Sequence, residues 1–151
     1  MKIKLGKTEL IHFIGIGGIG MSGLALIMKE LGFKVQGSDI SINKNIERLK
    51  KNKIKVFEGH KISNLNKTTV LVKSSAIKKN NSEFEHAKRK KIPIYSRGDM
   101  LGHVVSLMKN IVVAGSHGKT TTTSLISNIF SKAKIDPTVI NGGVLNSFGN
   151  S

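Results

Sequence analysis

Residues Leu10–Gly20 read LIHFIGIGGIG, and this stretch decides what kind of fold the chain can adopt. Its first five residues form a short apolar run, which has the length of a buried β-strand. Glycines follow at once, and apolar residues then recur at helical spacing from about Ile19 to Leu31, with Gly32 expected to cap the helix. A strand, a glycine turn and a helix in succession open a βαβ unit. We therefore expect an α/β fold built on a parallel sheet.

The glycines of this turn are Gly15, Gly17, Gly18 and Gly20, which match the spacing G-x-G-x-x-G. Glycine allows a tight turn and a close approach to a phosphate, and the free N–H groups of the following helix attract an anion. Asp39 lies where a carboxylate could meet a ribose hydroxyl. The turn therefore predicts a phosphate site. An NAD-dependent dehydrogenase would carry the same pattern, and so would a turn that only packs the helix against the sheet.

The rest of the first 108 residues continues the alternation of strands and helices. Further strands are expected at Lys34–Gln36, Lys55–Phe57, Thr69–Lys73 and Ile92–Tyr95, and further helices at Ile46–Lys51, Ser82–Lys90 and Met100–Met108. We interpret residues 1–108 as one Rossmann-like domain.

A second unit is expected over residues 109–151. Ile111–Ala114 has the pattern of a short buried strand, Thr120–Ala133 has helical spacing, and Asp136–Pro137 ends that helix. The tail Asn141–Ser151 shows no closing element. About 40 residues with one strand and one helix bury too little apolar surface to form a core. We therefore expect this unit to be the incomplete start of a P-loop ATP-binding domain.

The loop of the second unit is Gly115-Ser116-His117-Gly118-Lys119-Thr120. It resembles the end of the phosphate-binding pattern G-x-x-x-x-G-K-[ST], although Val113 stands where that pattern has its first glycine. In such a loop the lysine reaches the β- and γ-phosphates, and the threonine hydroxyl ligates Mg²⁺. A helix cap with an exposed lysine is the alternative. Phosphate loops in both units predict a protein that binds a nucleotide-linked substrate and ATP together.

Composition narrows the classes of function. The chain has 151 residues, a net charge of +16 and no cysteine, which excludes disulfides and thiolate metal sites. A basic chain can bind nucleic acid, but the lysines are scattered apart from the run Lys88–Lys91, and one tyrosine without tryptophan is a poor stacking platform. We therefore expect no nucleic-acid partner. No apolar segment is long enough for a signal peptide or membrane helix, which predicts a cytoplasmic protein without membrane insertion.

Several segments resemble the Mur ligase family, and within it the muramate–alanine branch. They are IHFIGIGGIGMSGLALIMKELGFKVQGSD (Ile11–Asp39), VFEGH (Val56–His60), SSAI (Ser74–Ile77), IPIYSRGDML (Ile92–Leu101), VVAGSHGKTTTTSLI (Val112–Ile126) and DPTVINGG (Asp136–Gly143). The resemblance spans nearly the whole chain. Family members more often carry Thr at the position of Ser116 and Glu at that of Asp99.

The resemblance implies an ATP-dependent ligase that joins L-alanine to UDP-N-acetylmuramate through an acyl phosphate, with Mg²⁺, in peptidoglycan synthesis. The implied UDP-sugar contacts are Gly15, Gly17, Gly18, Gly20, Ser38, Asp39, His60, Ser74, Ser75 and Arg97. The implied ATP contacts are Gly115, Ser116, His117, Gly118, Lys119, Thr120 and Thr121, with Lys119 and Thr120 catalytic and Thr120 on the metal. The family's later catalytic parts would follow Ser151, so the chain alone is expected to be inactive. A muropeptide-recycling ligase, which joins a tripeptide to UDP-muramate, and an NAD-dependent oxidoreductase are the alternatives.

Overall fold

The computed structural model describes residues 3–141 and 144–147. The chain divides into two compact units, Met1–Met108 and Lys109–Ser151. The ligands that the sequence assigns to the two units remain predictions. Among the described residues, none of the helices combines the length and the apolar character needed to cross a membrane.

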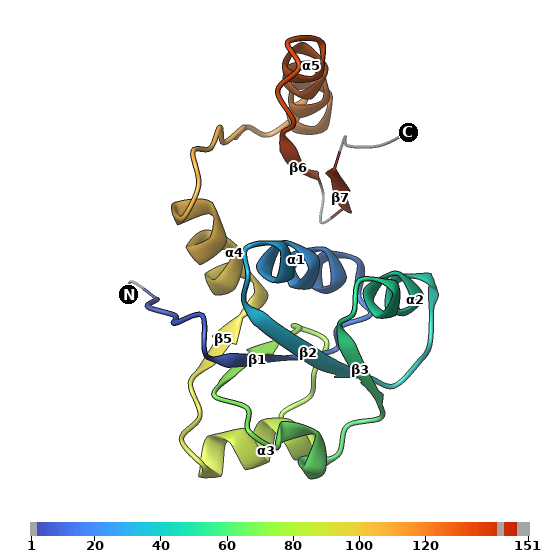
Figure 1. Cartoon of the computed structure of the whole chain (residues 1–151), viewed down its shortest axis with the longest axis vertical. Helices are drawn as coiled ribbons and strands as arrows, with labels where there is room; N and C mark the ends of the chain where they lie inside the picture. The colour runs from blue at the N-terminus through green and yellow to red at the C-terminus, as the bar shows by residue number, and fades with distance from the viewer. Residues whose placement is uncertain (1–2, 142–143, 148–151) are drawn as a thin grey trace. The chain divides into compact units, whose positions relative to one another are not determined.

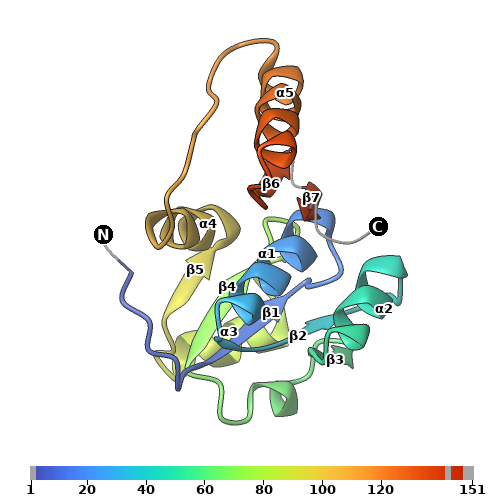
Figure 2. The same ribbon diagram turned by 45° about the horizontal axis from the view of Figure 1, so that its top comes forward.

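The first unit is built on a five-stranded sheet in which neighbouring strands are all parallel. Its order is β3-β2-β1-β4-β5; Figure 1 labels β1, β2, β3 and β5, and Figure 2 labels β4 between β1 and β5. The strands are β1 (Leu10–Ile14), β2 (Lys34–Asp39), β3 (Lys55–Glu58), β4 (Val70–Lys73) and β5 (Ile94–Ser96). The predicted fold class and strands are confirmed, with shifts of at most three residues at their ends. Along the chain, β1 to β3 extend the sheet in one direction, and β4 and β5 extend it in the other, so the order reverses between β1 and β4. Open α/β sheets bind ligands at such a switch point.

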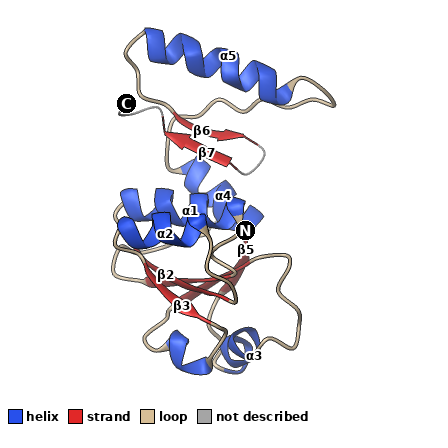
Figure 3. Ribbon diagram, turned by 90° about the vertical axis from the view of Figure 1, so that its right-hand side faces the viewer, coloured by secondary structure: helices blue, strands red, loops and turns tan. Residues whose placement is uncertain are grey.

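Helices cover both faces of this sheet. The helices α1 (Ile19–Glu30), α2 (Lys44–Lys51) and α4 (Arg97–Ser106) lie on one face, and α3 (Ser82–Arg89) lies on the other with the 3-10 helix η1 (Ile62–Leu65), as Figure 3 shows. Helix α4 begins at Arg97, three residues earlier than the sequence pattern indicates, because a capping box starts it there.

The two faces of β1 differ in character. Successive side chains of a strand point to opposite faces, so Ile11 and Phe13 share one face, while His12 and Ile14 point toward α3. All four are completely buried. On the α3 side, Ile14 belongs to an apolar cluster with Leu71 and with side chains of η1 and α3. His12 therefore places a polar ring on the α3 side of the sheet, beside this apolar cluster.

Gly32 follows Leu31, the C-cap of α1, and closes the helix as expected. Its N–H donates to the Lys29 carbonyl at 2.9 Å, and the N–H of Phe33 donates to the Met28 carbonyl at 3.0 Å. This pair of bonds is the Schellman motif, which needs a left-handed residue, and Gly32 has φ +85°. Three other helices end in the same bonding pattern with lysine in the left-handed position, at Lys53, Lys91 and Lys134.

The second unit consists of α5 (Lys119–Lys132) and an antiparallel hairpin of β6 (Thr138–Asn141) and β7 (Val144–Ser147). Figure 2 labels all three elements. The strand predicted at Ile111–Ala114 is wrong: this segment forms neither a strand nor a helix, and Ile111 and Val112 are 61% and 73% exposed. A strand forms only where a neighbour takes its backbone hydrogen bonds, and no described residue pairs with this segment. The expectation of a tail without further structure is also wrong, because β7 pairs with β6. Gly142 and Gly143, within the segment DPTVINGG, lie outside the described residues.

Candidate functional site

The predicted ligand residues of the first unit gather at the carboxyl ends of the strands. Gly15 follows β1, and Ser38 and Asp39 end β2. His60 follows β3, Ser74 follows β4, and Arg97 follows β5. Because all five strands are parallel, these ends share one edge of the sheet. The fold therefore brings together segments that are far apart in the sequence.

The glycine turn lies between β2 and β4. The N–H groups of Gly15 and Ile16 donate to the Ser38 carbonyl at 2.8 and 3.1 Å, and that of Gly18 donates to the Gly15 carbonyl at 3.3 Å. Gly15 has φ +77°, and a Cβ on it would lie 3.2 Å from the Cβ of Ser74. The turn is therefore tight at the switch point, where a side chain would be strained and crowded.

Asp39 already has a partner in the turn. Its Oδ2 accepts a hydrogen bond from the Gly17 N–H at 2.8 Å, and its Oδ1 accepts one from the Ser41 N–H at 3.3 Å. The carboxylate thus holds the backbone of the glycine turn, and only its remaining lone pairs are available to a ribose hydroxyl.

The start of α1 presents positive charge to this edge. Its N-cap is Gly18, which has no side chain to cap the helix, and the first turn contains no acidic residue. The first N–H groups of a helix have no partner within the helix and carry the positive end of its dipole. The guanidinium of Arg97 lies against Gly20, so that a Cβ on Gly20 would fall 3.2 Å from the guanidinium carbon. An anion at this point would meet both the helix terminus and a full positive charge.

A capping box on α4 fixes the position of Arg97, the first residue of this helix. The Ser96 hydroxyl accepts from the Asp99 N–H at 3.1 Å, and the Asp99 carboxylate accepts from the Ser96 N–H at 2.9 Å. The Ser96 hydroxyl also donates to Asp99 Oδ2 at 2.6 Å, and this bond, together with the one from the Ser96 N–H, lowers the pKa of Asp99. The acidic residue in SRGDML therefore caps a helix, which gives Asp99 a structural role.

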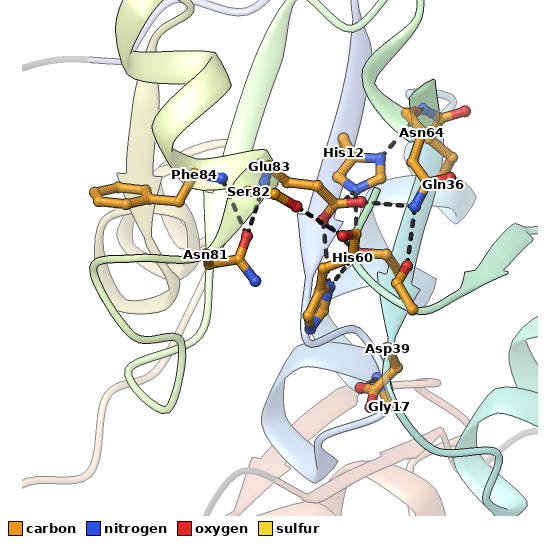
Figure 4. Close-up of polar contacts among 12 residues, drawn as sticks. His12, Gly17, Gln36, Asp39, His60, Asn64, Asn81, Ser82, Glu83 and Phe84 are labelled. Carbon is orange, nitrogen blue, oxygen red and sulfur yellow. Dashed lines mark hydrogen bonds and ion pairs between the residues drawn. The ribbon is translucent and has the colours of Figure 1, made fainter. Parts of the chain in front are cut away.

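His60 borders a buried polar network around Glu83 on the α3 side of the sheet (Figure 4). Ser38 belongs to the same network. The Ser38 hydroxyl is completely buried and donates to Glu83 Oε2 at 2.6 Å. His60 Nδ1 lies 3.0 Å from the Ser38 hydroxyl and 3.3 Å from Glu83 Oε2. The His60 side chain is 14% exposed, so it is the member of this pair that a ligand could reach.

Glu83 is the acceptor at the centre of this network. Its Oε1 accepts from the Asn64 amide at 2.7 Å, and His12 Nε2 lies 3.5 Å from its Oε2. The Gln36 amide nitrogen donates to the Asn64 carbonyl and lies 3.2 Å from His12 Nδ1. His12 therefore presents Nδ1 to the Gln36 amide and Nε2 to the Glu83 carboxylate.

Two opposing effects set the pKa of Glu83. Burial raises the pKa, but hydrogen bonds from His12, Ser38 and Asn64, together with the charge of His12, outweigh it, and the pKa is lowered. The carboxylate is therefore ionised inside the protein, surrounded by donors.

The remaining predicted residues of the first unit are more exposed. The Ser74 hydroxyl accepts from the Ala76 N–H at 3.3 Å, and Ser75 beside it is exposed. Both lie at the carboxyl end of β4, next to the glycine turn.

In the second unit, the glycine loop leads directly into α5. Gly118 is its N-cap, in the left-handed region at φ +76°. The Lys119 ammonium donates to the Gly115 carbonyl at 2.5 Å and to the Ser116 carbonyl at 3.0 Å, so it folds back over its own loop. Ser116, His117, Thr120 and Thr121 are exposed. Loop, helix terminus and lysine ammonium are together the parts that hold phosphates in P-loops.

Comparison with known proteins identifies the family. Residues 10–109 match the model described as "Mur ligase family, catalytic domain". The chain belongs to the Mur ligase family. It is 68% identical over all 151 residues to the UDP-N-acetylmuramate–L-alanine ligase of Pelagibacter ubique, of which it covers 32%. The chain therefore spans about a third of the length of this curated relative.

Two solved structures of Mur ligases are also similar. UDP-N-acetylmuramate-alanine ligase from Thermotoga maritima has a TM-score of 0.78 at 34% identity, covering 87% of this chain and 31% of that one. UDP-N-acetylmuramate:L-alanyl-gamma-D-glutamyl-meso-diaminopimelate ligase from Neisseria meningitides has a TM-score of 0.80 at 35% identity, covering 93% and 45%. The two scores are nearly equal, so the fold alone does not separate these two kinds of ligase.

The sequence did not reveal every polar residue of this Mur ligase chain that organises the site. It missed the buried network of His12, Gln36, Asn64 and Glu83. It also missed Asn43 and Asn45 near the start of α2, whose side-chain amides donate to the Gly17 carbonyl. One signal was available, because His12 interrupts the apolar run LIHFI. A lone histidine in a strand does not indicate its partners, however, since these come from β2, η1 and α3.

Proposed function

We propose that the first unit binds UDP-N-acetylmuramate for a ligase that joins L-alanine to it in peptidoglycan synthesis. The observation that carries this proposal is the glycine turn at the switch point, where the uncapped start of α1 and Arg97 converge on Gly20. The 68% identity to a UDP-N-acetylmuramate–L-alanine ligase supports the choice of ligand. A cytoplasmic setting is part of the proposal.

In this proposal the diphosphate occupies the positive end of α1. The N–H groups of the first helical turn donate to phosphate oxygens. The Arg97 guanidinium neutralises part of the negative charge of the diphosphate. His60 follows β3, and Ser74 and Ser75 follow β4 at the same edge of the sheet; these three residues are the candidates for uridine or sugar contacts. Ser38 would act through His60, because its own hydroxyl is bonded to Glu83.

We propose that the second loop binds ATP. In the proposed reaction a muramate carboxylate oxygen attacks the γ-phosphorus, ADP leaves, and the alanine amine then displaces phosphate from the acyl carbon. Lys119 would stabilise charge on the transferring phosphoryl group. Magnesium would screen the phosphate charge, with the Thr120 hydroxyl as one of its oxygen ligands and phosphate oxygens among the rest.

The alternative, a muropeptide-recycling ligase, is not favoured, because the relative at 68% identity is named UDP-N-acetylmuramate–L-alanine ligase. Both candidates share the UDP-muramate moiety, so the first unit would have the same role in either. The added amino acid or peptide is what distinguishes them.

Calorimetric titration of the chain with UDP-N-acetylmuramate and with NADH tests the proposed ligand. We expect the UDP-sugar to bind and NADH to give no response. Arg97→Ala should weaken UDP-sugar binding at least roughly tenfold, because a charge-assisted contact to phosphate is lost. Arg89→Ala, at the exposed end of α3, is the matched control and should bind normally. Tight NADH binding without a response to the UDP-sugar would contradict the proposal.

A further inference from the structure

The peptide groups on the two sides of Gly17 are held from outside the glycine turn. The Gly17 N–H donates to Asp39 Oδ2 at 2.8 Å. Its carbonyl accepts from two side-chain amides near the start of α2, from Asn45 at 2.8 Å and from Asn43 at 3.2 Å. The turn that precedes α1 is thus tied to β2 through its N–H and to α2 through its carbonyl.

The Gly17 carbonyl and the Gly18 N–H belong to one planar peptide group and point in opposite directions. With the carbonyl directed at α2, the Gly18 N–H closes the turn onto the Gly15 carbonyl at 3.3 Å. Glycine has no Cβ to oppose rotation of this peptide, and a rotated peptide would break that turn and redirect the first N–H groups of α1. External hydrogen bonds must therefore keep the peptide in its observed orientation.

The two asparagines are not equivalent. Asn43 is also the N-cap of α2, where its Oδ1 accepts from the Ile46 N–H at 3.1 Å, so replacing it would damage the helix as well. Asn45 lies within the first turn of α2 and makes the shorter bond to Gly17. It is therefore the residue at which the effect on the glycine turn can be isolated from the effect on α2.

We propose that Asn45 is a positioning residue for a nucleoside diphosphate: by donating to the Gly17 carbonyl, it locks the glycine turn in the orientation that directs α1 at the anion. This inference rests on the proposed function, because it assumes that the glycine turn binds a diphosphate. Asn45 itself does not touch the ligand. Its effect passes through one peptide group.

Asn45→Ala removes the hydrogen bond, Asn45→Asp replaces the donor with a carboxylate, and Asn45→Gln keeps an amide. Asn52→Ala is the matched control, since its amide also donates to a backbone carbonyl, that of Arg48 at 2.9 Å, at the other end of α2. Calorimetry with UDP measures affinity, and thermal unfolding measures stability. The backbone amide resonances of Gly18 and Gly20 in the ligand-free protein report the turn itself.

We expect Asn45→Ala to weaken UDP binding roughly tenfold, the value of a typical hydrogen bond. Asn45→Asp should lower the affinity for UDP further, and Asn45→Gln should keep part of the affinity that Asn45→Ala loses. Asn52→Ala should leave the affinity for UDP unchanged. The glycine resonances should shift in Asn45→Ala and stay in place in Asn52→Ala, with similar melting temperatures for both. Unchanged UDP affinity in Asn45→Ala, or an equal loss in Asn52→Ala, would overturn this inference alone. If the unaltered chain fails to bind UDP, the proposed function fails with it.

Discussion

Glu83 shows how much a single buried residue can organise. Its carboxylate is completely enclosed, and an ionised carboxylate in a protein interior is costly unless donors surround it. Here donors come from β1, β2, η1 and the loop after β3. The same carboxylate lies beside both His60 and Ser38, so it orients one side of the candidate ligand site as well as stabilising the fold.

We expect Glu83→Gln to lower the free energy of unfolding at pH 7 by about 1–3 kcal/mol, because an amide cannot accept all the hydrogen bonds that the carboxylate receives. The folded pKa of Glu83 lies below its unfolded value of 4.5. Its stabilising contribution is therefore fully present above that pH and is lost as pH falls through the folded pKa. The difference between the variant and the unaltered chain should accordingly shrink in acid.

Urea unfolding across a pH series measures this difference. Glu85→Gln, at an exposed position two residues further along α3, is the control and should unfold like the unaltered chain. A Glu83→Gln curve that ran parallel to the unaltered one at every pH would show that the carboxylate is not the titrating group.

At the scale of the elements, helix endings explain the one compact basic run in the sequence. Lys88–Lys91 closes α3, where positive charge interacts favourably with the helix dipole. Within the run, Lys90 is the C-cap at φ −82° and Lys91 adopts the left-handed conformation at φ 54°. Two adjacent lysines therefore occupy opposite regions of conformational space. The run therefore has a structural role at the end of a helix.

Lys91→Gly should stabilise the first unit by about 0.5 kcal/mol. Glycine removes a left-handed strain of roughly 1–2 kcal/mol, and its greater freedom in the unfolded chain offsets part of this gain. Lys90→Gly removes the same charge from a residue in an ordinary conformation and should destabilise instead. Thermal unfolding of the two variants compares them directly. A lower melting temperature for Lys91→Gly than for the unaltered chain would refute the strain at this position.

At the scale of the whole molecule, the two units differ in how completely they bury apolar side chains. The first unit encloses its sheet between helices on both faces, and Ile11, Phe13 and Leu71 are completely buried. In the second unit, Leu125 and Ile129 of α5 are 59% and 66% exposed. Protection against local opening comes from buried contacts of this kind, so the units should differ in local stability.

Hydrogen exchange should reveal this difference. We expect the backbone amides of Thr120–Ala133 to exchange much faster than those of β1 and β2, because α5 has few buried side chains to oppose local unfolding. Mass spectrometry of the exchanged chain resolves both regions in one experiment. Equal protection of α5 and β1 would contradict the prediction.

Local patterns in the sequence determine much of this protein by themselves. Apolar runs, helical spacing and glycine positions depend on residues close together in the chain, so they predict a parallel α/β sheet, the turn at Gly15–Gly20 and the helix after Lys119. Tertiary structure alone decides the rest. The contacts of Glu83 with His12, of Arg97 with Gly20 and of Asn45 with Gly17 join distant segments, so they depend on strand order and helix placement. The strand predicted at Ile111–Ala114 does not form for the same reason. An apolar run becomes a strand only beside a partner strand, and the local sequence does not determine whether a partner is present.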